Sequence, residues 1–139
     1  MVCPFCEIDK EKTMVLQSKK YTFVALSNPR LAFGHLLVIP KRHIEKLSEL
    51  TGDEKNELCN TVIEFQEKIL AKISTGCDIR QNYRPFQAQS KIKVDHLHIH
   101  LIPREYKDEI FRITQIHEKN LFKDLERAEM EKVLGLLKK

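Results

Sequence analysis

The stretch that decides the fold is "DHLHIHLIP", residues 95–103, in which three histidines alternate with leucine and isoleucine. Successive side chains of a β-strand point to opposite faces, so His96, His98 and His100 are expected on one face, with alternate residues roughly 6.6–6.8 Å apart. The intervening leucines and isoleucine then face a core. Imidazole binds metals, carries protons and acts as a nucleophile near neutral pH, so three histidines in strict alternation indicate a chemical use.

The segments around this strand predict an α+β fold. Strands are expected at 14–17, 21–26, 35–40, 77–85 and 94–103. Thr51 and Glu54 have the spacing of a capping box and begin a long helix over about 53–74. A second helix is expected near the C-terminus, on the apolar residues Leu121, Leu125, Ala128, Leu134 and Leu137. We therefore expect a mostly antiparallel sheet of about five strands with a long central helix and a C-terminal helix.

Composition narrows the class of protein and its partners. The chain has 139 residues, of which 42% are hydrophobic and 32% charged, typical of one globular domain. Apolar runs fall short of the roughly 20 residues that span a bilayer, so no membrane partner is expected. The N-terminal residues lack the apolar segment of a secretory signal, which predicts a cytoplasmic protein.

Charge is more informative in its distribution than in its sum. The net charge of +4, from 24 basic and 20 acidic residues, is too mild to indicate a nucleic-acid partner. Basic residues nevertheless gather around the histidine stretch: Lys41, Arg42, Arg80, Arg84, Lys91, Lys93 and Arg104. Such a field suits a phosphorylated small molecule, although solvated strand ends and loops would give the same pattern.

The histidines themselves leave two kinds of chemistry to consider. Alternate histidines can supply metal ligands, but a catalytic zinc needs a further ligand and an open position, and Asp95 is expected on the opposite face. A neutral imidazole can instead attack phosphorus while a hydrogen bond to its other nitrogen fixes the tautomer. With only four glycines, widely spread, the chain has no glycine-rich phosphate loop.

"CPFC", residues 3–6, raises a separate question. The spacing of Cys3 and Cys6 suits either zinc or a thioredoxin-type dithiol. A redox dithiol should follow a strand and open a helix, whereas this pair opens the chain, so zinc is favoured. A closed tetrahedral zinc site then needs two more ligands.

These motifs together resemble one family. "HLHIHLI" (96–102) resembles the alternating motif of the histidine triad family of nucleotide hydrolases and transferases. "GHLLVIPKRH" (34–43) looks like the strand and turn that precede that triad, and "CPFC" resembles the zinc-carrying members. The similarity covers residues 3–104, which leaves 105–139 as a C-terminal extension of a single domain spanning 1–139.

The resemblance implies a mechanism and a metal site. His98 would attack the α-phosphorus of a phosphoanhydride, phosphoramidate or dinucleoside polyphosphate to give a nucleotidyl-histidine. His100 would hydrogen-bond the phosphate or the leaving group, and water or another acceptor would release the nucleotide. A structural zinc would be held by Cys3, Cys6, His43 and His96.

The resemblance also implies nucleotide contacts and a partner. The acidic residue that contacts the ribose in the family falls here at Ser27 or Asn28, of which Asn28 would make the contact without a carboxylate. Asn82, Gln89 and Ser90 would line the phosphate site. The stretch from Ser90 to His96 is longer than in the family, which motivates a rival hypothesis: a nucleotide-binding or scaffolding module with little turnover. A metal-dependent hydrolase is a third hypothesis. Relatives commonly dimerise by extending the sheet, so a homodimer is expected.

Overall fold

The structure is a computed structural model that describes residues 2–138. Within them the chain forms two compact units, the first ending at Tyr106 and the second beginning at Lys107. The first unit contains all the residues for which a functional role is predicted. The organisation of 1–139 as a single domain stays a prediction.

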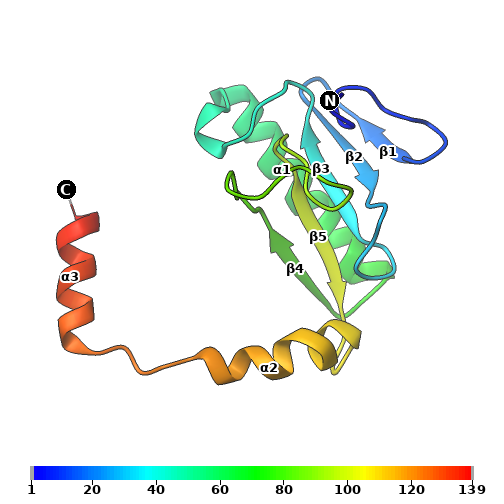
Figure 1. Ribbon diagram of the computed structural model, residues 1–139. Coiled ribbons are helices and arrows are strands. Elements are labelled where there is room, and N and C mark those ends of the chain that lie inside the picture. Colours follow the sequence, from blue (N-terminus) through cyan, green and yellow to red (C-terminus); the bar gives the residue numbers. More distant parts are fainter. Residues whose placement is uncertain (1, 139) are drawn as a thin grey trace. The chain divides into compact units, whose positions relative to one another are not determined.

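The first unit is built on one five-stranded antiparallel sheet, as expected (Figure 1). Its strands are β1 (Val15–Ser18), β2 (Thr22–Leu26), β3 (Leu36–Pro40), β4 (Gly76–Arg80) and β5 (Ile99–Arg104). Their order across the sheet is β1-β2-β3-β5-β4, and each neighbouring pair is antiparallel. This order places β5, which carries the last histidine of the triad, between β3 and the edge strand β4.

Helix α1 (Gly52–Lys72) covers one face of the sheet, after a short 3-10 turn η1 (Leu47–Glu49) (Figure 1). The predicted capping box is present: the Thr51 hydroxyl accepts the Glu54 N–H at 3.2 Å, and the Glu54 carboxylate accepts the Thr51 N–H at 2.8 Å. An apolar stripe at helical spacing packs against the sheet to form the main core: Leu58, Val62, Phe65 and Ile69.

On the opposite face of the sheet, the N-terminal segment packs over β2 and β3. Phe5 and Ile8 pack against a smaller buried cluster from β2 and β3: Phe23, Ala25, Leu37 and Ile39. The segment that holds Cys3 and Cys6 is therefore folded onto the sheet face opposite α1.

The last strand differs from the prediction of 94–103, because hydrogen-bonded pairing begins only at Ile99. Before that residue, other hydrogen bonds replace strand pairing. The Leu97 N–H bonds the Ile44 carbonyl at 2.6 Å, and the Pro40 carbonyl accepts from the His96 ring at 2.7 Å. The alternation nevertheless holds, because Leu97 and Leu101 both lie in the core beneath α1.

The other boundaries also shift. β4 ends at Arg80, so 81–85 is loop rather than the predicted strand.

The second unit is helical. A π-helical turn η2 (Phe111–Gln115), α2 (Ile116–Glu118) and η3 (Lys119–Leu121) precede α3 (Arg127–Leu137). The predicted C-terminal helix is confirmed as α3, with Leu121 and Leu125 lying before it. Among the described residues, no helix is both long and apolar enough to cross a membrane.

Candidate active site and metal centre

Four side chains from distant parts of the chain converge at one end of the histidine stretch. One ligand atom of each of Cys3, Cys6, His43 and His96 lies within 4.8 Å of all the others. The Cys3 sulfur is 3.4 Å from His96 Nδ1, and the Cys6 sulfur is 3.3 Å from His43 Nδ1. The two Nδ1 atoms are 3.1 Å apart. The structure thus brings the four predicted metal ligands together.

The donor set fits a tetrahedral metal ion. His96 is 1% exposed, and its Nε2–H donates to the Pro40 carbonyl, so the Nδ1 lone pair faces the cluster. Burial lowers the pKa of His96, which favours the neutral form that binds metals. Desolvation and the neighbouring Cys3 raise the pKa of the Cys6 thiol, and a cation between the sulfurs would reverse this effect. These residues can hold a metal.

The next histidine presents the opposite ring nitrogen. The His98 Nδ1–H donates to the His96 carbonyl at 2.7 Å, which leaves the lone pair on Nε2. Burial lowers the pKa of His98 below its ordinary value, so the ring is neutral near pH 7. A neutral imidazole with its tautomer fixed by a backbone carbonyl is the form in which histidine acts as a nucleophile.

The third histidine of the triad is paired with one that sequence analysis missed. His35 Nδ1 accepts the Leu31 N–H at 3.0 Å, so a neutral His35 carries its proton on Nε2 and donates to His100 Nδ1 at 2.9 Å. Burial lowers the pKa of His100 to about 3 and that of His35 to about 4. Neutral His100 is therefore an Nε2–H donor.

The position of His35 depends on the residue before it. Gly34 has φ +83°, a left-handed conformation that favours glycine, and a Cβ atom there would lie 3.0 Å from a methyl of Ile73. His35 directly precedes β3, and the register of β3 with β5 pairs Leu37 with His100. A single histidine at a strand start gives no sequence signal for this contact. The adjacent glycine in "GHLLVIP" is the only hint.

Phe5 connects the metal centre with the candidate nucleophile. Its ring meets that of His96 edge-on at 5.7 Å between centroids, and that of His98 at 5.2 Å with an interplanar angle of 68°. Since Phe5 lies between Cys3 and Cys6, the segment that carries two of the candidate ligands also packs against His98.

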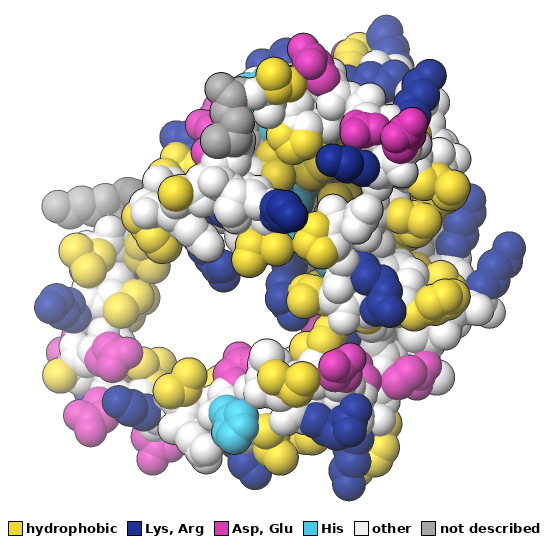
Figure 2. Space-filling view, turned by 45° about the vertical axis from the view of Figure 1, so that its right-hand side comes forward, with side chains coloured by type: hydrophobic (Ala, Val, Ile, Leu, Met, Phe, Trp, Pro, Cys, Tyr) yellow, Lys and Arg dark blue, Asp and Glu magenta, His cyan; other side chains and the backbone are white. Residues whose placement is uncertain are grey.

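The predicted basic surroundings are only partly available to a ligand. Three of the seven residues are engaged in ion pairs: Arg42 with Glu54, Lys93 with Asp95 and Arg104 with Asp78. Arg80 is the register partner of His100 across β4 and β5, and its charge helps to lower the pKa of that histidine. On the face shown in Figure 2, basic and acidic side chains are interleaved.

The predicted nucleotide contacts lie in loops, and several already have partners. The Asn28 amide donates to the Lys12 carbonyl at 2.9 Å. The Gln89 side chain accepts the Asp95 N–H at 3.1 Å, and the Ser90 hydroxyl accepts the Ile92 N–H at 3.3 Å. The bonds of Gln89 and Ser90 brace the loop before His96, which is longer than in the family.

The remaining nucleotide candidate, Asn82, lines a small pocket with Glu45, Arg84 and His96. That pocket lies beside the first histidine of the triad. Contact of Asn28, Asn82, Gln89 or Ser90 with a nucleotide stays a prediction.

This fold and site define the class of protein. The sequence model of the HIT domain matches residues 7–107, and the chain belongs to the HIT domain family. The family resemblance read from the three motifs is thereby confirmed.

Individual relatives agree. The chain is 31% identical over 114 residues to the adenosine 5'-monophosphoramidase of Candida albicans, covering 77% of this chain and 72% of that one. A HIT family protein from Bacillus subtilis superposes with a TM-score of 0.64 at 24% identity, over 86% of this chain and 91% of that one. A Zn-bound histidine triad family protein from Mycobacterium smegmatis also superposes with a TM-score of 0.64, at 23% identity, over 77% of this chain and 78% of that one.

Proposed function

We propose that this chain is a nucleotide hydrolase or transferase that cleaves a phosphoanhydride, phosphoramidate or dinucleoside polyphosphate at the α-phosphorus. The observation that carries the proposal is the state of His98, a half-buried neutral imidazole whose Nδ1–H donates to the His96 carbonyl. The phosphoramidase activity in the name of the Candida relative supports the substrate class.

The first step forms a bond from His98 Nε2 to the α-phosphorus as the bond to the leaving group breaks. Positive charge develops on the ring during attack, and the His96 carbonyl, which accepts from Nδ1–H at 2.7 Å, stabilises that charge. His100 donates its Nε2–H to the phosphate or to the leaving-group oxygen or nitrogen. In the second step, water attacks phosphorus and releases a proton to solvent, the N–P bond breaks with its electron pair returning to His98 Nε2, and the nucleoside monophosphate leaves.

We propose zinc as the metal held by Cys3, Cys6, His43 and His96, because two thiolates and two neutral imidazoles are a donor set typical of structural zinc. All four positions are filled by protein, so the ion would cross-link the N-terminal segment to the triad. Metal analysis of untagged protein should give about one zinc per chain.

We also propose that Asn28, Asn82, Gln89 and Ser90 contact the nucleotide and that the protein is a cytoplasmic homodimer. β4 is an edge strand with Ile79 exposed, and α1 leaves Ile63 and Leu70 exposed, so both offer apolar surface to a second copy. Light scattering that gives the mass of a monomer would contradict the dimer.

The decisive test is turnover of adenosine 5'-phosphoramidate by wild type and His98→Asn. We expect a loss of about a thousandfold or more in kcat/KM, because removing a nucleophile removes the covalent route. His117→Asn is the matched control, since His117 is exposed in the second unit. Denaturing quench with labelled substrate should trap a nucleotidyl-enzyme in wild type only. Retained turnover in His98→Asn refutes the mechanism.

A nucleotide-binding module with little turnover is the second candidate. The bonds from Gln89 to the Asp95 amide and from Ser90 to the Ile92 amide favour it, because they tie up side chains predicted to hold phosphate. Calorimetry that shows tight AMP binding, together with no turnover of phosphoramidate or dinucleoside polyphosphates, would establish this function instead.

A further inference from the structure

We propose that Arg42 is a positioning residue for the metal centre, because its side chain fastens the turn that carries His43 to the first turn of α1. This inference rests on the proposed zinc site. Arg42 is not one of the four proposed ligands, but it directly precedes one of them, His43, in the sequence.

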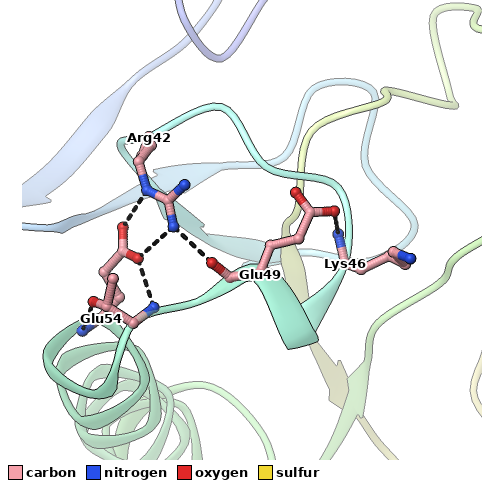
Figure 3. A network of polar contacts seen from close by, with 5 residues as sticks. Arg42, Lys46, Glu49 and Glu54 are labelled. Carbon is pink, nitrogen blue, oxygen red and sulfur yellow. Dashed lines mark hydrogen bonds and ion pairs between the residues drawn. The ribbon is translucent and has the colours of Figure 1, made fainter.

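The contacts of Arg42 are shown in Figure 3. Its Nε donates to one Glu54 carboxylate oxygen at 3.2 Å, and its Nη2 donates to the other at 2.8 Å. The same Nη2 also donates to the Glu49 carbonyl at 2.7 Å. A guanidinium that binds a carboxylate with two parallel bonds is fixed in both distance and orientation.

Glu54 is itself a rigid anchor. Its side chain caps the N-terminus of α1 by accepting the Thr51 N–H at 2.8 Å, and the residue is only 4% exposed. The hydrogen bond from Arg42, followed by that from the Thr51 backbone, lowers the pKa of Glu54 to about 2. The carboxylate is therefore ionised throughout the pH range in which the protein would work, and the pair persists.

The rest of the turn explains why this anchor matters. The Lys41 N–H bonds the Tyr21 carbonyl at 2.8 Å, and the Ile44 carbonyl accepts the Leu97 N–H at 2.6 Å. Between these two backbone ties, His43 is exposed, so packing constrains it little. Its Nδ1 must nonetheless stay 3.1 Å from the Nδ1 of buried His96. The hydrogen bonds of the Arg42 guanidinium therefore constrain the position of the turn directly beside His43.

The test is the rate at which zinc leaves the full-length protein in excess chelator. Outer contacts that orient ligands typically change metal affinity by 10–100-fold, so we expect Arg42→Ala to release zinc about tenfold faster and to bind it about tenfold more weakly. Arg42→Lys, which keeps the charge but loses the fork, should lie between Arg42→Ala and wild type.

Lys19→Ala provides the matched control. Lys19 also ties a loop to α1, through Glu64 at 3.1 Å and Thr61 at 3.1 Å, but it adjoins no proposed ligand. Unfolding in urea measures the stability lost by each variant. Faster zinc release in Arg42→Ala than in a Lys19→Ala protein of similar stability supports the proposal, and equal release rates overturn it. A wild-type chain that binds no zinc would instead refute the metal site.

Discussion

His96 and His98 are separated by one residue, yet they present opposite ring nitrogens. In His96 a backbone carbonyl, that of Pro40, accepts from Nε2 and leaves Nδ1 for the cluster of Cys3, Cys6 and His43. In His98 a backbone carbonyl, that of His96, accepts from Nδ1 and leaves Nε2. The same side chain is thus suited to the proposed role of metal ligand or to that of nucleophile according to which nitrogen the backbone engages.

The alternating motif alone therefore does not assign the roles. Alternation puts the histidines on the sheet face opposite α1, but neighbouring carbonyls and the N-terminal segment determine which ring nitrogen of each is available. His100 illustrates a third outcome, since its Nδ1 is engaged by another side chain, His35, rather than by backbone.

The largest expected effects come from mutations that separate the proposed roles of His96 and His98. His96→Ala should lose zinc, and at metal concentrations near a thousand times Kd this removes about 4 kcal/mol from the free energy of unfolding. His98→Asn should keep about one zinc per chain while turnover is lost. Metal analysis, urea unfolding and AMP release measure the three quantities.

A chelator extends this comparison without mutation. Removal of zinc should lower stability first and activity only as the fold loosens. Loss of activity at once, at full stability, would show that the metal takes part in the chemistry and would favour a metal-dependent hydrolase. Zinc loss in His98→Asn would show that the two histidines do not have separate roles.

A smaller effect is expected at the third histidine. His35→Leu removes the donor to His100 Nδ1, so His100 can take the wrong tautomer, and kcat should fall by about tenfold to a hundredfold. His35→Gln places an amide N–H near the position of the lost Nε2–H and should recover part of the rate. If both variants lose the same amount, His35 acts through packing rather than through its hydrogen bond.

The most gradual effect is a dependence of stability on pH. His35 and His100 have folded pKa values of about 4 and about 3, below the ordinary value near 6.5. Below that ordinary value the unfolded chain binds more protons, so their contribution is complete above about pH 6.5 and is lost as the pH falls toward 4. Each histidine contributes at most about 1.4 kcal/mol per pH unit.

Urea unfolding of wild type and His35→Gln between about pH 7 and pH 5 measures the contribution of His35 together with its effect on the pKa of His100. The variant should lose less stability on acidification than wild type does. Zinc loss at low pH affects both proteins alike and cancels in the difference. Identical slopes would show that His35 titrates normally in the folded protein.

Much of the fold follows from local sequence. The capping box at Thr51 and Glu54 lies within a few residues and is confirmed, and the helix predicted over about 53–74 is confirmed as Gly52–Lys72. The predicted start of the last strand was wrong: pairing begins at Ile99, and before it the Leu97 N–H bonds the Ile44 carbonyl while the His96 ring bonds the Pro40 carbonyl.

The site was predictable only where a motif was present. The four proposed ligands come from motifs of the family resemblance, and the fold gathers them. His35 lies 65 residues from His100, and only the register of β3 with β5 brings the two together, so no local pattern could reveal it. Likewise, nothing in the sequence around Gln89 shows that its side chain braces a loop.

The placement of Phe5 against two imidazoles has a practical consequence. Its ring current should shift the NMR signals of His98, which lies 5.2 Å away, from those of the exposed His117 in the same spectrum. A nucleotide that binds at the proposed site beside His98 should change that shift before any bond to phosphorus is made. The native protein would then report substrate binding through the signals of His98, with no label attached.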